Sequence, residues 1–126
     1  MNRPDPHDRG MEVRREVLGD EHVDRAVEET TELTQGFQEL ITRYAWGEVW
    51  SRPGLERRER SMITLALLAA LGHEDELAMH VRAAVRIGLS PEQISEVLLH
   101  TGLYAGVPVA NRGLAVARDV LDENTP

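Results

Sequence analysis

The sequence contains no cysteine and no lysine, and each absence excludes a class of chemistry. Without cysteine, the chain can form no disulfide, no thiolate nucleophile and no CxxC redox centre. Without lysine, it can form neither a Schiff base with a carbonyl substrate nor the lysine aldimine on which pyridoxal phosphate enzymes depend. All 14 basic residues are arginines.

Aromatic residues, positive net charge and long apolar runs are also scarce. Aromatics make up 4% of the 126 residues, which favours a helical protein with close backbone packing. The net charge of −8 argues against nucleic acid or an anionic membrane as a partner. The run Met62–Leu71 is too short to cross a bilayer, and the first ten residues lack the apolar core of a signal peptide. We therefore expect a cytoplasmic protein.

Apolar periodicity and turn residues predict an all-α fold, a single-domain bundle of six to seven helices over residues 10–122. No segment alternates with a period of two for long enough to form a strand. Asp20 and Ser90 are predicted N-caps, and Ser90 forms a capping box with Gln93. We expect residues 1–9 to be disordered and residues 123–126 to fray. The helices are expected at about 10–18, 21–30, 34–49, 56–71, 75–87, 91–105 and 108–122.

His80 is the first candidate for a chemical role. The stretch "LALLAALGHEDELAMHVRAAVRIG" (65–88) predicts an apolar helix, a polar turn and a second helix whose apolar stripe His80 interrupts. Leu77, Val81, Ala84 and Val85 share or flank its face of the helix. A histidine in this setting is either a satisfied core residue or a proton-transfer group, and the pattern leaves both interpretations open.

The spacing of His73, Glu76 and His80 (HxxExxxH) raises the possibility of a metal site. His73 lies in the turn before the expected helix, however, so the three side chains do not share one helix face. Surface capping by His73 and an ordinary contact between Glu76 and His80, four residues apart, are the favoured interpretations. We expect no metal.

The segment "RYAWGEVW" (43–50) is the second candidate. It holds Arg43, Trp46, Glu48 and Trp50 within eight positions near a helix end. Aromatics this concentrated in an aromatic-poor chain indicate a pocket wall or an interface. The structural alternative is a helix cap with core anchors. Glu48 stands out because its neighbours are uncharged.

Two further polar groups have both a structural and a functional interpretation. His100 and Tyr104, beside Glu96, are spaced for one helix face, and a core hydrogen-bonding group is the favoured interpretation. An arginine cluster near residue 58 could bind a carboxylate with two parallel hydrogen bonds, although a solvated helix start is favoured. The cluster consists of Arg57, Arg58 and Arg60.

The segment from "RSMITLALLAALGHEDELAMHVRAAVRIG" through "LSPEQISEVLLHTGLYAGVPVAN" resembles the carboxymuconolactone decarboxylase family. The resemblance lies in the order of an apolar helix, a polar turn, an "H-x-R-A-A" helix and a final "YAGxPxAN". Upstream, "GMEVRREVLGDEHVDRA" and "FQELITRYAWGEVWSRPGL" resemble the branch that acts on 4-carboxymuconolactone. The resemblance covers roughly residues 10–120 and implies an alkyl hydroperoxidase D-like fold.

The peroxidase branch of that wider family uses a CxxC pair followed four residues later by a histidine. His80 matches the histidine, but His73 and Glu76 stand where the cysteines would be. Ser61 occupies the position of that branch's relay glutamate. Since a thiol–disulfide cycle needs sulfur, the sequence excludes peroxidase chemistry of this kind.

The resemblance implies a carboxy-lyase that converts 4-carboxymuconolactone to 3-oxoadipate enol-lactone and CO2, without a cofactor, in the protocatechuate branch of the β-ketoadipate pathway. On this hypothesis His80 is the general acid that protonates the dienolate. Glu48 orients or reprotonates His80, or positions the substrate. The expected substrate-binding residues are an arginine for the remaining carboxylate (Arg43 ahead of Arg58 and Arg52), an apolar wall (Trp46 and Trp50) and Tyr104.

The expected partners are a small dicarboxylate lactone and further copies of the chain. Members of the family assemble as rings, often hexamers, and the helix that is apolar on every side over Met62–Leu71 agrees with burial at more than one contact. Two alternatives remain. One is a non-catalytic helical oligomer or ligand-binding protein of the same fold, and the other is a related lactone decarboxylase with a different substrate.

Overall fold

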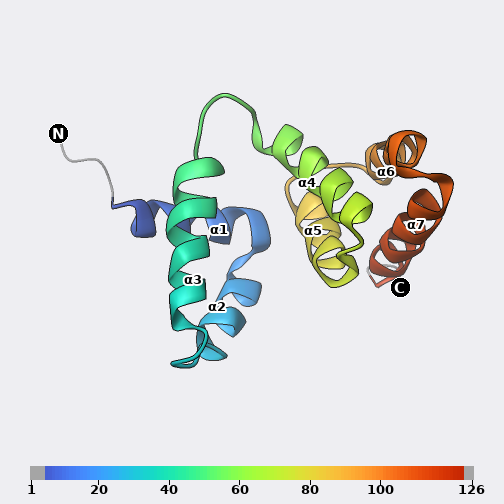
Figure 1. The fold of residues 1–126 in the computed structure, drawn as a ribbon. Coiled ribbons are helices and arrows are strands. Elements are labelled where there is room, and N and C mark those ends of the chain that lie inside the picture. Colours follow the sequence, from blue (N-terminus) through green and yellow to red (C-terminus); the bar gives the residue numbers. More distant parts are fainter. Residues whose placement is uncertain (1–4, 124–126) are drawn as a thin grey trace. The chain divides into compact units, whose positions relative to one another are not determined.

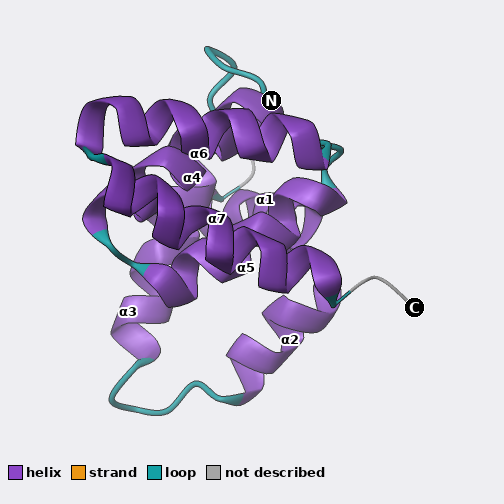
Figure 2. Cartoon of the chain, turned by 90° about the vertical axis from the view of Figure 1, so that its right-hand side faces the viewer, coloured by secondary structure: helices purple, strands orange, loops and turns teal. Residues whose placement is uncertain are grey.

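The computed structural model describes residues 5–123, which form seven α-helices and one π-helix, with no strand in that range (Figures 1 and 2). The predicted all-α class is confirmed. The elements are α1 (Pro6–Leu18), α2 (Asp20–Glu28), α3 (Gln35–Leu40), the π-helix η1 (Ile41–Val49), α4 (Arg57–Leu71), α5 (Glu74–Arg86), α6 (Pro91–Ala105) and α7 (Val107–Asp122).

The chain divides between Glu56 and Arg57 into two compact units. The amino-terminal unit contains α1 to η1, and the carboxy-terminal unit contains α4 to α7. The single domain that the sequence predicts over residues 10–122 includes helices of both units and stays a prediction. The division follows a non-helical segment that includes Pro53 and Gly54, residues that end the preceding helix.

In the amino-terminal unit, α1 packs against η1 at close range. A Cβ atom added at Gly10 would overlap the backbone carbonyl oxygen of Thr42, and one added at Gly47 would overlap that of Pro6. Arg9 Nε also donates to the carbonyl oxygen of Gly47 at 2.8 Å. The two glycines therefore let one backbone lie directly on the other.

The predicted helix over 34–49 is confirmed in extent, but its second part is a π-helix. α3 and η1 run as one continuous coil (Figure 1). At its end, the Trp50 amide donates to the carbonyl of Ala45, five residues back, at 2.9 Å. Such widened turns are rare in proteins, and many of those that occur lie at functional sites.

The first helix begins earlier than the sequence predicts. Residues 6–9, expected to be disordered, form its first turn. Asp5 caps this turn by accepting from the His7 amide at 2.7 Å, and Pro6 stands at the first helical position, where a missing amide hydrogen has no cost. Residues 1–4 lie outside the described range.

Of the two predicted N-caps, that of α2 differs in the structure and that of α6 is confirmed. Asp20 is not the N-cap of α2, because Gly19 (φ 93°) occupies that place and Asp20 is the first helical residue. Its carboxylate instead accepts from Arg15 at 3.2 Å. The predicted capping box of α6 is confirmed: the Ser90 hydroxyl accepts from the Gln93 amide, and the Gln93 side chain accepts from the Ser90 amide.

The carboxy-terminal unit has an aliphatic core. α4 packs against α5 and α6, and α7 packs against α5 and α6. At the end of the chain, Glu123, which was expected to fray, is held by Arg82 Nε and Nη2 at 3.0 and 2.8 Å. Residues 124–126 lie outside the described range. The core side chains include Leu65, Leu77, Val81, Ala84, Ile94, Leu98, Ala117 and Val120.

Measured against a bilayer, every helix within residues 5–123 is too short or too polar to pass through it.

Candidate functional site

His80 lies on the buried face of α5. Its side chain is 8% exposed, and Leu77, Val81 and Ala84 of the same helix are buried with it. The predicted position of an imidazole among aliphatic residues is confirmed. An imidazole gives and takes protons near neutral pH, which is the property that the proton-transfer interpretation uses.

Ser61 on α4 and Thr101 on α6 are also buried polar residues of the carboxy-terminal unit. The Thr101 hydroxyl donates to the carbonyl of Val97 at 2.8 Å. Ser61 as a residue is 1% exposed, and its hydroxyl has no hydrogen-bond partner among the described residues. The Ser61 hydroxyl is therefore a buried polar group left unsatisfied within residues 5–123.

The segment "RYAWGEVW" contributes residues to both the core and the surface of the amino-terminal unit. Trp46 is buried at 6% exposure, Trp50 is half-buried, and their rings lie 4.9 Å apart with a tilt of 34°. Glu48 is exposed. Trp46 thus lies in the core of this unit, whereas Trp50 is only half-buried and Glu48 lies on the surface.

The three candidate arginines have different surroundings. Arg43, on η1, lies 3.6 Å from Asp5 and 3.9 Å from Glu39, with its side chain 45% exposed. Arg52 is exposed. Arg58 is not a solvated helix start: its Nη1 and Nη2 donate to the Gly88 carbonyl and the Gln93 side chain at 2.8 and 3.0 Å. These bonds tie α4 to the loop before α6 and to the first turn of α6.

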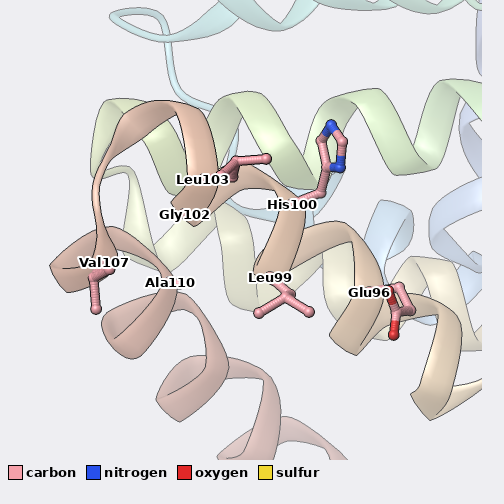
Figure 3. Close-up of a pocket in the computed structure, with 7 residues that line it drawn as sticks. All are labelled: Glu96, Leu99, His100, Gly102, Leu103, Val107 and Ala110. Carbon is pink, nitrogen blue, oxygen red and sulfur yellow. The ribbon is translucent and has the colours of Figure 1, made fainter.

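The interpretation of His100, Tyr104 and Glu96 as a core group is wrong. All three are exposed, Tyr104 by 82%, and the His100 and Tyr104 rings lie 5.4 Å apart on the surface of α6. A pocket of about 410 Å³ lies between α6 and α7, where Leu99 and His100 leave α6 on different sides (Figure 3). Its lining is mostly apolar, with Glu96 and His100 as the titratable groups.

The HxxExxxH spacing does not form a cluster in the structure. His73 precedes α5 as its cap residue and is exposed, as is Glu76, whereas His80 is buried. Within residues 5–123, no three histidine or acidic side chains are close enough to hold one metal ion.

The predicted site residues belong to both units. His80, Arg58 and Tyr104 lie in the carboxy-terminal unit. The amino-terminal unit holds the others, of which the structure brings Trp46 and Trp50 into contact. They are Arg43, Trp46, Glu48, Trp50 and Arg52.

Arg14 is a buried charged residue that the sequence analysis did not single out. It is 4% exposed, and its guanidinium donates to the Thr42 hydroxyl at 3.2 Å and the Gln38 side chain at 3.1 Å. Burial lowers the pKa of Arg14 below its usual value, and the charge of Arg15 lowers it further. A sequence signal existed, since Arg14 shares helical spacing with the buried residues Gly10, Val13 and Val17.

Comparison with known proteins identifies the family. The model described as "Carboxymuconolactone decarboxylase family" matches residues 35–119, from α3 into α7. This chain belongs to the carboxymuconolactone decarboxylase family. The resemblance inferred from the sequence is thereby confirmed, and the match includes both η1 with Glu48 and α5 with His80.

Two curated relatives carry decarboxylase names. The chain is 48% identical over 123 residues to a 4-carboxymuconolactone decarboxylase of Acinetobacter baylyi, an alignment that covers 98% of this chain and 92% of the relative. It is 40% identical over 116 residues to the nitrosuccinic acid decarboxylase npaB of Metarhizium robertsii, covering 92% and 81%. Relatives in this family thus act on different acids.

Proposed function

We propose that this protein is a carboxy-lyase that converts 4-carboxymuconolactone to 3-oxoadipate enol-lactone and CO2 in aromatic catabolism. The observation that carries the proposal is the 48% identity to a 4-carboxymuconolactone decarboxylase over nearly the full length of both chains. The alignment includes both compact units and every predicted site residue.

The chemistry of the substrate explains why so few protein groups are needed. When the carboxylate leaves the γ-carbon as CO2, the electron pair of the broken C–C bond moves through the ring double bond to the lactone carbonyl. The resulting dienolate needs a hydrogen-bond donor at oxygen and then a proton on carbon. Because the substrate holds its own electron sink, the reaction requires neither a lysine nor a thiol.

His80 is the proposed general acid, since it is the buried imidazole of the family-matched α5. Glu48, an exposed carboxylate on η1, is proposed to orient or reprotonate His80 or to position the substrate. The two residues belong to different units, so the proposal requires both to reach one substrate molecule.

Arg43 remains the first choice for the carboxylate that does not leave. Its contacts with Asp5 and Glu39 are long, so a substrate can compete for its N–H groups. Arg58 already donates to Gly88 and Gln93, and Arg52 comes after both. Trp46 and Trp50 are the proposed apolar wall, and Tyr104 lines the substrate's approach.

The role of His80 is tested with His80→Gln, which keeps a polar side chain but cannot carry a proton. We expect turnover of the lactone, followed by ultraviolet absorbance, to fall by roughly 10²–10⁴-fold while circular dichroism and the melting temperature stay close to wild type. His73→Gln, seven residues away on the surface, is the matched control and should retain activity. A folded His80→Gln protein with wild-type turnover would contradict the assignment.

The role of Glu48 is tested with Glu48→Gln beside the surface control Glu28→Gln. We expect a smaller fall in kcat than for His80→Gln. If the two groups act as one unit, the double variant will lose little more than His80→Gln alone. Unchanged kinetics in Glu48→Gln would remove Glu48 from the mechanism.

A second candidate function is decarboxylation of a different dicarboxylic acid. The 40% identity to a nitrosuccinic acid decarboxylase favours this alternative specifically. Measuring kcat/KM for both acids with the same enzyme, with and without a chelator, separates the candidates. The proposal for 4-carboxymuconolactone requires the higher kcat/KM for that lactone and no loss on chelation.

We also propose that the chain is a homo-oligomer, with a hexamer as the expected ring, acting in the cytoplasm. Large apolar side chains on α4, α6 and the start of α7 are exposed, and a groove of about 590 Å³ runs between α4 and α6. Light scattering should show a multimer that Leu67→Glu weakens, and a wild-type monomer would contradict the proposal. The exposed residues are Ile63, Leu67, Leu71, Leu99, Leu103, Tyr104 and Val107.

A further inference from the structure

The amino-terminal unit contains a pocket of its own, of about 530 Å³, built mainly on α1, α3 and η1. Arg14 lies in its lining with Gln38 and Thr42, the two side chains to which its guanidinium donates. All the lining residues belong to this one unit. Its lining among the described residues thus includes no residue of α5, the helix that holds His80.

The charge of Arg14 is not neutralised by any carboxylate of the described chain. Both of its partners are neutral, a hydroxyl and an amide oxygen. Its Nε has no hydrogen-bond partner there. A buried charge of this kind is costly unless it is paired, so a guanidinium at 4% exposure without an anion is the signature of an incomplete site.

The acidic residues of the pocket face side chains other than Arg14. Asp5 and Glu39 both face Arg43, at 3.6 and 3.9 Å. Asp8 lies 3.8 Å from the His7 imidazole. None of these three carboxylates forms an ion pair with Arg14, whose hydrogen-bond partners are both neutral.

The neutral groups beside Arg14 add further donors. An arginine only donates, so the Gln38 amide must present its oxygen to Arg14 and its NH2 group elsewhere. Gln35 also lines the pocket and carries a second amide. The Thr42 hydroxyl accepts from Arg14 and donates to the backbone carbonyl of Gln38 at 2.7 Å. These two bonds fix the orientation of the hydroxyl. A planar guanidinium flanked by amide donors matches the two oxygens of a carboxylate.

We propose that this pocket binds the carboxylate of a small organic acid on Arg14. The remaining N–H groups of the guanidinium hold the carboxylate, and the amide of Gln38 donates beside them. The pocket also contains Arg43, which is proposed to bind the substrate, but the present proposal rests on Arg14 and its neutral partners and not on the decarboxylase function.

The test uses succinate as the probe at constant ionic strength, with three proteins: wild type, Arg14→Met and Arg15→Met. Methionine replaces the long side chain with an apolar one of similar reach. Arg15 is the matched control, since it is the next residue on α1 and its charge is already paired with Asp20 and Asp24 on the surface. Binding is measured from the rise in melting temperature with succinate concentration and, in wild type, from the NMR signal of the Arg14 Nε–H.

We expect succinate to raise the melting temperature of wild type and Arg15→Met and to shift the Arg14 Nε–H signal saturably. Its affinity for Arg14→Met should be weaker by roughly tenfold to a hundredfold. An equal rise in all three proteins, or an Arg14 signal that succinate does not move, would overturn the proposal. The NMR titration decides the matter even where Arg14→Met fails to fold.

Two further readouts separate the sources of the carboxylate. If the substrate supplies it, Arg14→Met raises the KM for the lactone, and if another acid does, the KM stays at the wild-type value while succinate binding is lost. Dissociation of an oligomer by Arg14→Met, with no succinate effect on wild type, would assign Arg14 to a partner's side chain and overturn the proposal.

Discussion

The two units are stabilised in different ways. The carboxy-terminal unit buries branched aliphatic side chains such as Leu65, Leu98 and Val120 between four helices. The amino-terminal unit has a smaller apolar core, lets two backbones touch at Gly10 and encloses a guanidinium. One unit therefore depends on filled volume, and the other combines close backbone approach with a buried charge whose partners are neutral. Within residues 5–123, both units carry pockets, but only the pocket of the amino-terminal unit is lined by a buried guanidinium.

The largest expected effect is the removal of core volume from the carboxy-terminal unit. Leu98 is fully buried, so Leu98→Ala should lower the free energy of unfolding by about 2–5 kcal/mol through lost burial and the cavity that remains. Urea denaturation of the full chain measures the change. Leu33→Ala, at a residue 92% exposed, is the control and should change little. Equal effects of the two variants would show that the unit does not depend on filled volume.

The next effect tests the backbone contact in the amino-terminal unit. In Gly10→Ala, the new methyl group meets the backbone of Thr42, which cannot rotate away as a side chain can. We expect a loss of about 1–3 kcal/mol, seen as faster amide hydrogen exchange in α1 and η1. Gly36→Ala is the control, because a Cβ there meets open space. If Gly10→Ala is as stable as Gly36→Ala, the close approach of α1 and η1 is not what holds this unit together.

The smallest effect concerns a surface ion pair of the carboxy-terminal unit. Hydrogen bonds from Arg82 lower the pKa of Glu123 below its usual value. A lowered pKa in the folded state means that the pair stabilises the protein above the unfolded-state pKa and stops doing so as the pH falls through the folded-state value. The difference in unfolding free energy between wild type and Glu123→Gln should therefore be small at pH 7 and vanish at acid pH. A difference that grows on acidification would contradict this linkage.

Much of the fold could be predicted because its signals are local. The capping box of α6 lies in four consecutive residues, and the burial of His80 follows from the apolar residues around it on one helix. Family membership came from the ordered motifs over α4 to α7. These features need no knowledge of what packs against them.

The rest depended on contacts between distant segments. Arg58 resembles a solvated arginine until Gly88 and Gln93, 30 and 35 residues away, come within reach of its guanidinium. Tyr104 was expected in a core because its spacing from His100 is helical, but the periodicity does not say which side of α6 is covered. The π-helix has no local signal, since its spacing in "ITRYAWGEV" is also compatible with an ordinary helix.

The π-helix also constrains how this segment can vary in length. Each of its wide turns takes in more residues than an α-helical turn, as the bond from Trp50 back to Ala45 shows. Deleting one residue between Ile41 and Ala45 while the ladder kept its wide turns would rotate the following side chains by the turn of one residue, about 100° in an α-helix. Trp46 would leave its buried position and Glu48 would face a new direction. Insertions and deletions here should thus be as damaging as substitutions, even though the segment ends in a surface loop.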